Sequence, residues 1–115
     1  MAQTFKVVTK AGVTSADVIY TVAGSTTTVI LGLMLGNTTS GSSNATVTLG
    51  TDTANRAGDN NEPNQAVELL TTTAIPGNTT LELLAGNKVV METTDTLSVT
   101  GSAALDVVLS IMEIT

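Results

Sequence analysis

The chain of 115 residues has no histidine, no cysteine and no tryptophan, and aromatic residues make up only 2% of it. Without cysteine it forms no disulfide and has no thiol chemistry, and its redox compartment stays undetermined. Histidine is the side chain that most often acts as a general base near neutral pH. Its absence leaves only Lys6, Lys10 and Lys88 to activate a serine or threonine, and no spacing singles out such a pair. We therefore expect no enzymatic activity and no cofactor.

Basic residues and long apolar runs are also scarce. Four basic residues against ten acidic ones give a net charge of −6. Nucleic acids and anionic membranes both attract clustered lysine and arginine, so neither is an expected partner. The longest apolar run, Val29 to Leu35, is far too short to span a bilayer, and Met1 to Lys10 lacks the apolar segment of a secretory signal. These features predict a soluble protein that is made in the cytoplasm and not exported by a signal peptide.

Threonine, by contrast, is abundant, with 23 of the 115 residues. Its β-branched side chain suits a half-exposed strand surface. Short stretches of alternating apolar and polar residues are separated by turn residues, and helical periodicity is nearly absent. The expected strands are residues 5–9, 18–22, 26–35, 45–51, 65–71, 80–84, 88–92, 96–100 and 104–114. This pattern predicts an all-β fold, a single-domain β-sandwich or jelly roll of about eight antiparallel strands over residues 1–115.

The alternation also assigns side chains to faces. In residues 26–35 the odd positions from Val29 to Leu35 form one apolar face, and in residues 18–22 the even positions form another. The odd positions of the last strand line one face as well. Its second face carries Val108, Met112 and Ile114. This second face is more apolar than a solvated surface needs, which indicates either burial inside the sandwich or pairing with another subunit.

Paired carboxylates are the arrangement that glycosidases use as acid and base. The candidates are Glu82 with Glu92, on neighbouring strands, and Asp95 with Asp106. All four are expected at outward or turn positions, where a solvated charge is the simpler interpretation.

The most polar stretch, residues 52–64, is predicted to be a long loop. Its many oxygen atoms could wrap a calcium ion, although the spacing of an EF-hand loop is missing. The alternative is contact with a neighbouring subunit, for which the single arginine is suited by its planar, two-pronged geometry. We assign no catalytic, cofactor-binding or metal residue. The predicted subunit-interface residues are Phe5, Val7, Arg56, Asp59, Glu62, Met112 and Ile114.

Two parts of the sequence resemble a known family. One is residues 18–33, VIYTVAGSTTTVILGL, and the other is residues 74–84, AIPGNTTLELL, continuing through residues 88–92, 95–99 and 109–114. Both resemble small virion structural proteins of tailed bacteriophages, many of them from marine and cyanobacterial hosts. The resemblance implies assembly of a particle without catalysis, and it brings no catalytic residues with it.

This resemblance sets the functional expectation. It implies a capsid decoration (cement) protein that stabilises the shell through oligomeric contacts with the major capsid protein. Its partners would be copies of itself, for example in a trimer, and other virion proteins, and its location would be the virion assembled in the host cytoplasm. One alternative is an adaptor or fibre-attachment protein of the neck, tail or baseplate. Another is a carbohydrate-binding module for the host surface, which the lack of aromatic residues disfavours.

Overall fold

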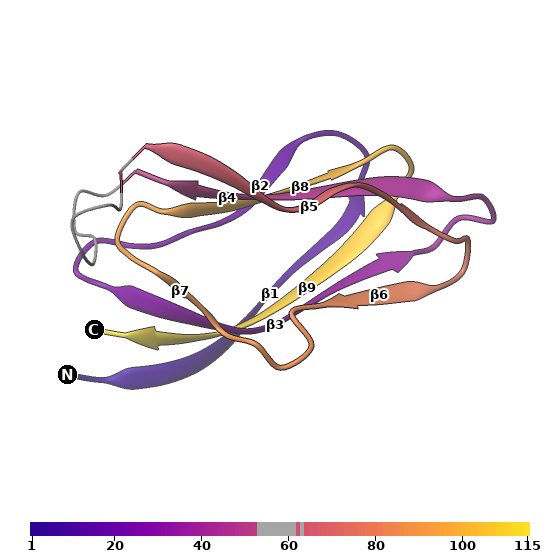
Figure 1. The fold of residues 1–115 in the computed structure, drawn as a ribbon. Coiled ribbons are helices and arrows are strands. Elements are labelled where there is room, and N and C mark those ends of the chain that lie inside the picture. The colour runs from indigo at the N-terminus through magenta and orange to yellow at the C-terminus, as the bar shows by residue number, and fades with distance from the viewer. Residues whose placement is uncertain (53–61, 63) are drawn as a thin grey trace.

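The computed structural model describes residues 1–52, 62 and 64–115, and it confirms the all-β prediction. The described residues form nine strands and no helix. The strands are β1 (Gln3–Val13), β2 (Asp17–Thr21), β3 (Thr27–Asn37), β4 (Ser43–Thr51), β5 (Gln65–Ile75), β6 (Thr80–Leu83), β7 (Val89–Met91), β8 (Thr96–Gly101) and β9 (Leu105–Ile114). They build two antiparallel sheets that pack face to face, with the two chain ends side by side (Figure 1).

The strand order is that of a jelly roll. Sheet A has the order β1-β9-β3-β6, with β7 also paired to β3, and sheet B has the order β2-β8-β4-β5. β6 and β7 can be taken as one interrupted strand, because both pair with β3. The pairs are then β1 with β9, β2 with β8, β3 with β6 and β7, and β4 with β5, each nested inside the one before. This nested pairing is the jelly-roll arrangement of eight strands in two sheets.

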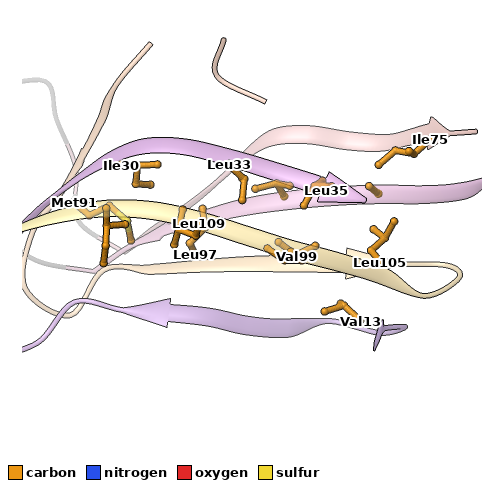
Figure 2. Close-up of a cluster of buried hydrophobic side chains, with 14 of the residues drawn as sticks. Val13, Ile30, Leu33, Leu35, Ile75, Met91, Leu97, Val99, Leu105 and Leu109 are labelled. Carbon is orange, nitrogen blue, oxygen red and sulfur yellow. The ribbon is translucent and has the colours of Figure 1, made fainter. Parts of the chain in front are cut away.

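An aliphatic core fills the space between the sheets. Alternate residues of the central strands point inward, because successive side chains of a strand lie on opposite faces. In β9 the inward residues are Leu105, Val107, Leu109 and Ile111, as the alternation predicts, and all are at most 1% exposed. They join leucines, valines and isoleucines from both sheets in one cluster (Figure 2).

Two bulges overturn the facial assignments made for β2 and β3. The pairing of β3 with β9 shifts between Ile30 and Gly32, so Ile30 and Leu33 both point inward while Val29 lies on the outer face. The predicted continuous odd-numbered face is therefore wrong. In β2 a shift between Val18 and Tyr20 leaves Val18 outward and exposed, while Tyr20 packs against the core. A bulge inserts one residue into the ladder and so reverses the alternation beyond it.

Candidate functional site

The outer face of sheet A is apolar over four strands. Opposite residues of paired strands share a face, so the register gives one cross-strand row, Phe5–Met112–Val29–Val90, from β1 through β9 and β3 to β7. Further members of this outer face are Val7, Met34, Val108 and Ile114. We call these eight residues the apolar face. Phe5 is 72% exposed and Val90 is 57% exposed, so the row has a large hydrocarbon side chain in solvent at each of its two ends.

The outer face of sheet B has the opposite character. Its cross-strand rows join threonine to threonine, threonine to serine, and threonine to glycine. The residues are Thr46 with Thr100, Thr48 with Ser98, and Gly50 with Thr96. We call this surface the threonine face. Hydroxyl groups here can bond to water, whereas the row Phe5–Met112–Val29–Val90 on the apolar face contains no hydroxyl group. The two outer surfaces of the sandwich are therefore chemically different.

A shallow hollow of about 320 Å³ lies at one end of the apolar face. It is lined by Met34, Gly36, Thr38, Thr80, Asp106 and Val108. Gly36 contributes no side chain, and the nearest atoms to the position of a Cβ there are Thr80 Oγ1 at 3.5 Å and the Asp106 carbonyl oxygen at 3.8 Å. The apolar face therefore ends in a depression that can receive a side chain from a partner.

A polar cluster joins the two sheets at the end of the sandwich that holds the chain termini. The carboxylate of Glu113 on β9 pairs with the Lys6 ammonium on β1 at 2.7 Å and accepts a hydrogen bond from the Tyr20 hydroxyl at 2.6 Å. The Tyr20 oxygen also lies 2.7 Å from Thr28 Oγ1 on β3. Since Tyr20 belongs to sheet B and the others to sheet A, the cluster ties the sheets together and fixes the position of β1.

The cluster shifts two pKa values in opposite directions. Burial, with a further contribution from the hydrogen bond to Glu113, raises the pKa of Tyr20 to about 12. The bond from Lys6, followed by the bond from Tyr20, lowers the pKa of Glu113 below its ordinary value of 4.5. The phenol therefore stays protonated and the carboxylate stays ionised over the whole neutral range.

These shifts predict how stability depends on pH. The lowered pKa of Glu113 gives stability that is present above pH 4.5 and is lost as the pH falls through the folded-state pKa. The raised pKa of Tyr20 gives stability that is present below its ordinary pKa of 10 and is lost as the pH rises toward 12. We expect Glu113→Gln to flatten the acid limb and Tyr20→Phe to flatten the alkaline limb, in urea unfolding measured across pH. An acid limb as steep in Glu113→Gln as in the wild type would contradict this assignment.

Four of the seven predicted interface residues come together on the apolar face: Phe5, Val7, Met112 and Ile114. Glu62 lies elsewhere, exposed and within 3.5 Å of the Gln65 amide nitrogen. Arg56 and Asp59, and with them the question of a calcium ion in the 52–64 loop, lie outside the described residues. Sequence reasoning missed Val29, Met34 and Val90, since assigning them to this face requires the strand register.

The first candidate carboxylate pair, Glu82 with Glu92, does not come together. Glu82 on β6 stands opposite Met34, whereas Glu92 directly follows β7, whose last residue is opposite Thr28. At the rise per residue of a strand, these points on β3 are about 20 Å apart. The expectation of a solvated Asp95 is wrong, because this residue is fully buried and accepts bonds from the backbone N–H groups of Asp52 and Glu92. Asp106 accepts a bond from the Gly12 N–H.

Over the part of the chain that the structure describes, no group of three acidic side chains lies close enough to hold a metal ion. The same residues include no helix long and apolar enough to cross a membrane.

Fold and surfaces together define this chain as a jelly-roll sandwich with one apolar and one threonine-rich outer face. No protein-family model matches the sequence, and no curated protein matches it. Among solved structures, a Bacillus chain described under "Bacillus endospore appendages form a novel family of disulfide-linked pili" is similar with a TM-score of 0.49 and 15% identity. The match covers 97% of this chain and 84% of that chain. A likeness this distant says nothing about what the present chain does.

Proposed function

We propose that this chain is a non-enzymatic structural subunit of a tailed-bacteriophage virion, acting as a capsid decoration protein. The observation that carries the proposal is the contrast between the two outer faces. A decoration subunit needs one surface that binds the shell and an opposite surface that stays in water. The apolar face meets the first requirement and the threonine face meets the second.

The binding surface is argued from continuity. Single exposed apolar residues are ordinary on protein surfaces, but a contiguous apolar patch marks a contact with another molecule. Here Phe5, Met112, Val29 and Val90 adjoin one another across four strands. In a decorated shell many copies bind at once, so modest contacts repeated over the particle add up to a strong attachment. The sequence resemblance to phage virion proteins supports the choice of partner, the major capsid protein.

A substitution on each face tests the proposal. Val90 on the apolar face and Val18 on the outer side of sheet B are 57% and 55% exposed, so they form a matched pair. We expect Val90→Asp to weaken attachment to virions that lack the protein by at least about 100-fold, because a carboxylate would be buried without a partner. Val18→Asp should bind like the wild type. Cosedimentation of purified protein with such particles measures both.

Two results would count against the proposal. If Val18→Asp weakened attachment as much as Val90→Asp, the apolar face would not be the contact. If the wild type did not attach to shells at all, the decoration role would be wrong. Copy number then separates the neck or tail alternative, since decoration requires many more copies per particle than a neck or tail position does.

A further inference from the structure

The four edges of the two sheets differ in how open they are to another strand. β2 has five residues and a bulge, and β6 and β7 have four and three residues. β5 is interrupted by register shifts at two places, and its Thr72 has a φ of +43°. Short or bulged edges of this kind resist pairing with other chains. β1 differs, since it runs without irregularity from Gln3 to Lys10.

The hydrogen bonds of β1 fix which of its backbone groups are open. Ala2 and Thr115 exchange both N–H···O bonds, each 2.9 Å long, so they form a hydrogen-bonded pair. In an antiparallel ladder such pairs alternate with non-bonded ones. The even residues of β1 therefore bond to β9, and the odd residues aim their N–H and C=O groups away from it. The odd residues are Gln3, Phe5, Val7 and Thr9.

Two features of the side chains bear on what can pair with this edge. Phe5 and Val7 belong to the apolar face, so a strand added here would extend that face. Lys6 and Lys10 are on the inward side of the edge strand, where charges usually discourage pairing. Each is already neutralised within its own chain, Lys6 by Glu113 at 2.7 Å and Lys10 by Asp17 at 3.4 Å.

We propose that β1 pairs antiparallel with β1 of a second copy, around a two-fold axis at Lys6. In this register all four open N–H groups and all four open C=O groups of each copy find partners, because Phe5 meets Val7 of the second copy and Gln3 meets its Thr9. Aromatic and β-branched residues are a favourable cross-strand pair, and the two-fold axis makes this pair twice. The two sheets become one, and their apolar faces join into a double-width surface.

A second copy fits better than a ring of three. A ring needs two different complementary edges on each subunit, and β2, β5, β6 and β7 are all short or bulged among the described strands. An antiparallel β1 pair needs β1 alone. The pairing is a property of the purified protein and does not depend on the proposed function. Only the use of the two joined apolar faces for binding a shell rests on that function, which the pairing deepens.

The register has one unfavourable contact, Lys6 opposite Lys6 of the second copy. Like charges directly opposite each other weaken a strand pair. The Glu113 carboxylate, 2.7 Å from the Lys6 ammonium in each copy, reduces this repulsion.

Proline substitution separates the dimer from the monomer fold. The N–H of Val7 is unused within one chain, so Val7→Pro should leave the sandwich folded while removing a central intermolecular bond. The N–H of Val8 bonds to β9, so Val8→Pro should instead lower the urea midpoint of the monomer. Thr9→Pro is a second edge variant that leaves the apolar face unchanged. Val90→Asp is the control for that face, because Val90 is three strands away from the edge.

Sedimentation velocity of the purified protein, without particles, is the measurement. We expect the wild type to reach twice its 11.6 kDa chain mass in the high-micromolar range. Val7→Pro and Thr9→Pro should weaken association at least tenfold with circular dichroism unchanged, and Val90→Asp should dimerise normally. A wild type that stays monomeric at near-millimolar concentration, a trimeric mass, or folded edge variants that dimerise like the wild type would each overturn the pairing. Whether Val90→Asp binds shells tests only the proposed function and has no bearing on the β1 pairing.

Discussion

Replacing Gly77 by alanine is expected to destabilise the protein by about 3 kcal/mol, at the upper end of what overpacking usually costs. A Cβ at this position would overlap the carbonyl oxygen of Ser40 and would lie 2.5 Å from its carbonyl carbon and 2.9 Å from the carbonyl oxygen of Thr39. These are backbone atoms of another loop, so no side chain can rotate to make room. Either the turn after β5 or the loop after β3 has to move.

Neither loop moves without losing hydrogen bonds. The Asn78 N–H donates to the Thr39 carbonyl at 3.0 Å, and the Asn37 N–H donates to the Thr79 carbonyl at 2.8 Å. The buried Asn37 side chain holds both loops as well, since its amide nitrogen donates to the carbonyls of Gly41 and Ile75, each at 2.8 Å. Buried polar groups that lose such partners destabilise a protein further.

Gly41→Ala is the matched control for Gly77→Ala. Gly41 belongs to the same pair of loops, but a Cβ there would have nothing within 4 Å. We expect its effect to stay within about 0.5 kcal/mol, as for an ordinary surface change. The free energy of unfolding from urea titration compares the two variants with the wild type. Equal stability of Gly77→Ala and Gly41→Ala would mean that the loops are not packed as described.

The sequence was sufficient to predict the fold class. Short alternating segments, threonine and regularly spaced turn residues indicated a sandwich or jelly roll, and the interior side of β9 followed directly from its alternation. The faces of β2 and β3 could not be predicted in this way. A bulge leaves no clear mark on composition, yet one inserted residue in each strand turned Val18 of β2 outward and placed Val29 of β3 on the outer face.

The candidate site was predictable only as separate residues. Met112 and Ile114 are predicted because the second face of the last strand is more apolar than a solvated surface needs, whereas Phe5 and Val7 are predicted only as residues of the N-terminal strand. Their union into a face depends on β1 and β9 being neighbours, although these strands lie at opposite ends of the chain. The same long-range pairing brings Lys6 to Glu113, and the crossing between sheets brings Tyr20 to both. No local pattern encodes such contacts.

Threonine is concentrated on one of the two outer surfaces of the sandwich. In the cross-strand rows that cover sheet B, threonine and serine face one another, and their hydroxyls keep that surface compatible with water. Apolar residues gather on the outer side of sheet A instead, where β1, β9, β3 and β7 carry them. A chain with 12% charged residues therefore makes one outer surface rich in hydroxyl groups and the other apolar, mainly through the choice between threonine and aliphatic residues.

Leu109→Ala is expected to lower the free energy of unfolding by about 3 kcal/mol, within the range for a buried leucine. Leu109 is fully buried in the middle of sheet A, between Val8 on β1 and Leu33 on β3, and it belongs to the same cluster as Leu97 of the opposite sheet (Figure 2). Removing its branched end leaves a cavity that two hydrogen-bonded sheets cannot close. Leu109→Met, which conserves volume, should cost less than about 1.5 kcal/mol.

Met112→Ala on the same strand provides the contrast that links stability to function. Met112 lies on the apolar face of β9 and is only half-buried, so we expect its truncation to cost less than about 1 kcal/mol of stability. If the proposed function holds, Met112→Ala should nevertheless weaken attachment to shells, whereas folded Leu109→Ala should attach normally. Urea unfolding and particle cosedimentation of the two variants test both sides of β9 at once. If Met112→Ala lost as much stability as Leu109→Ala, its side chain would belong to the core, and the apolar face would be a continuation of that core instead of a contact surface.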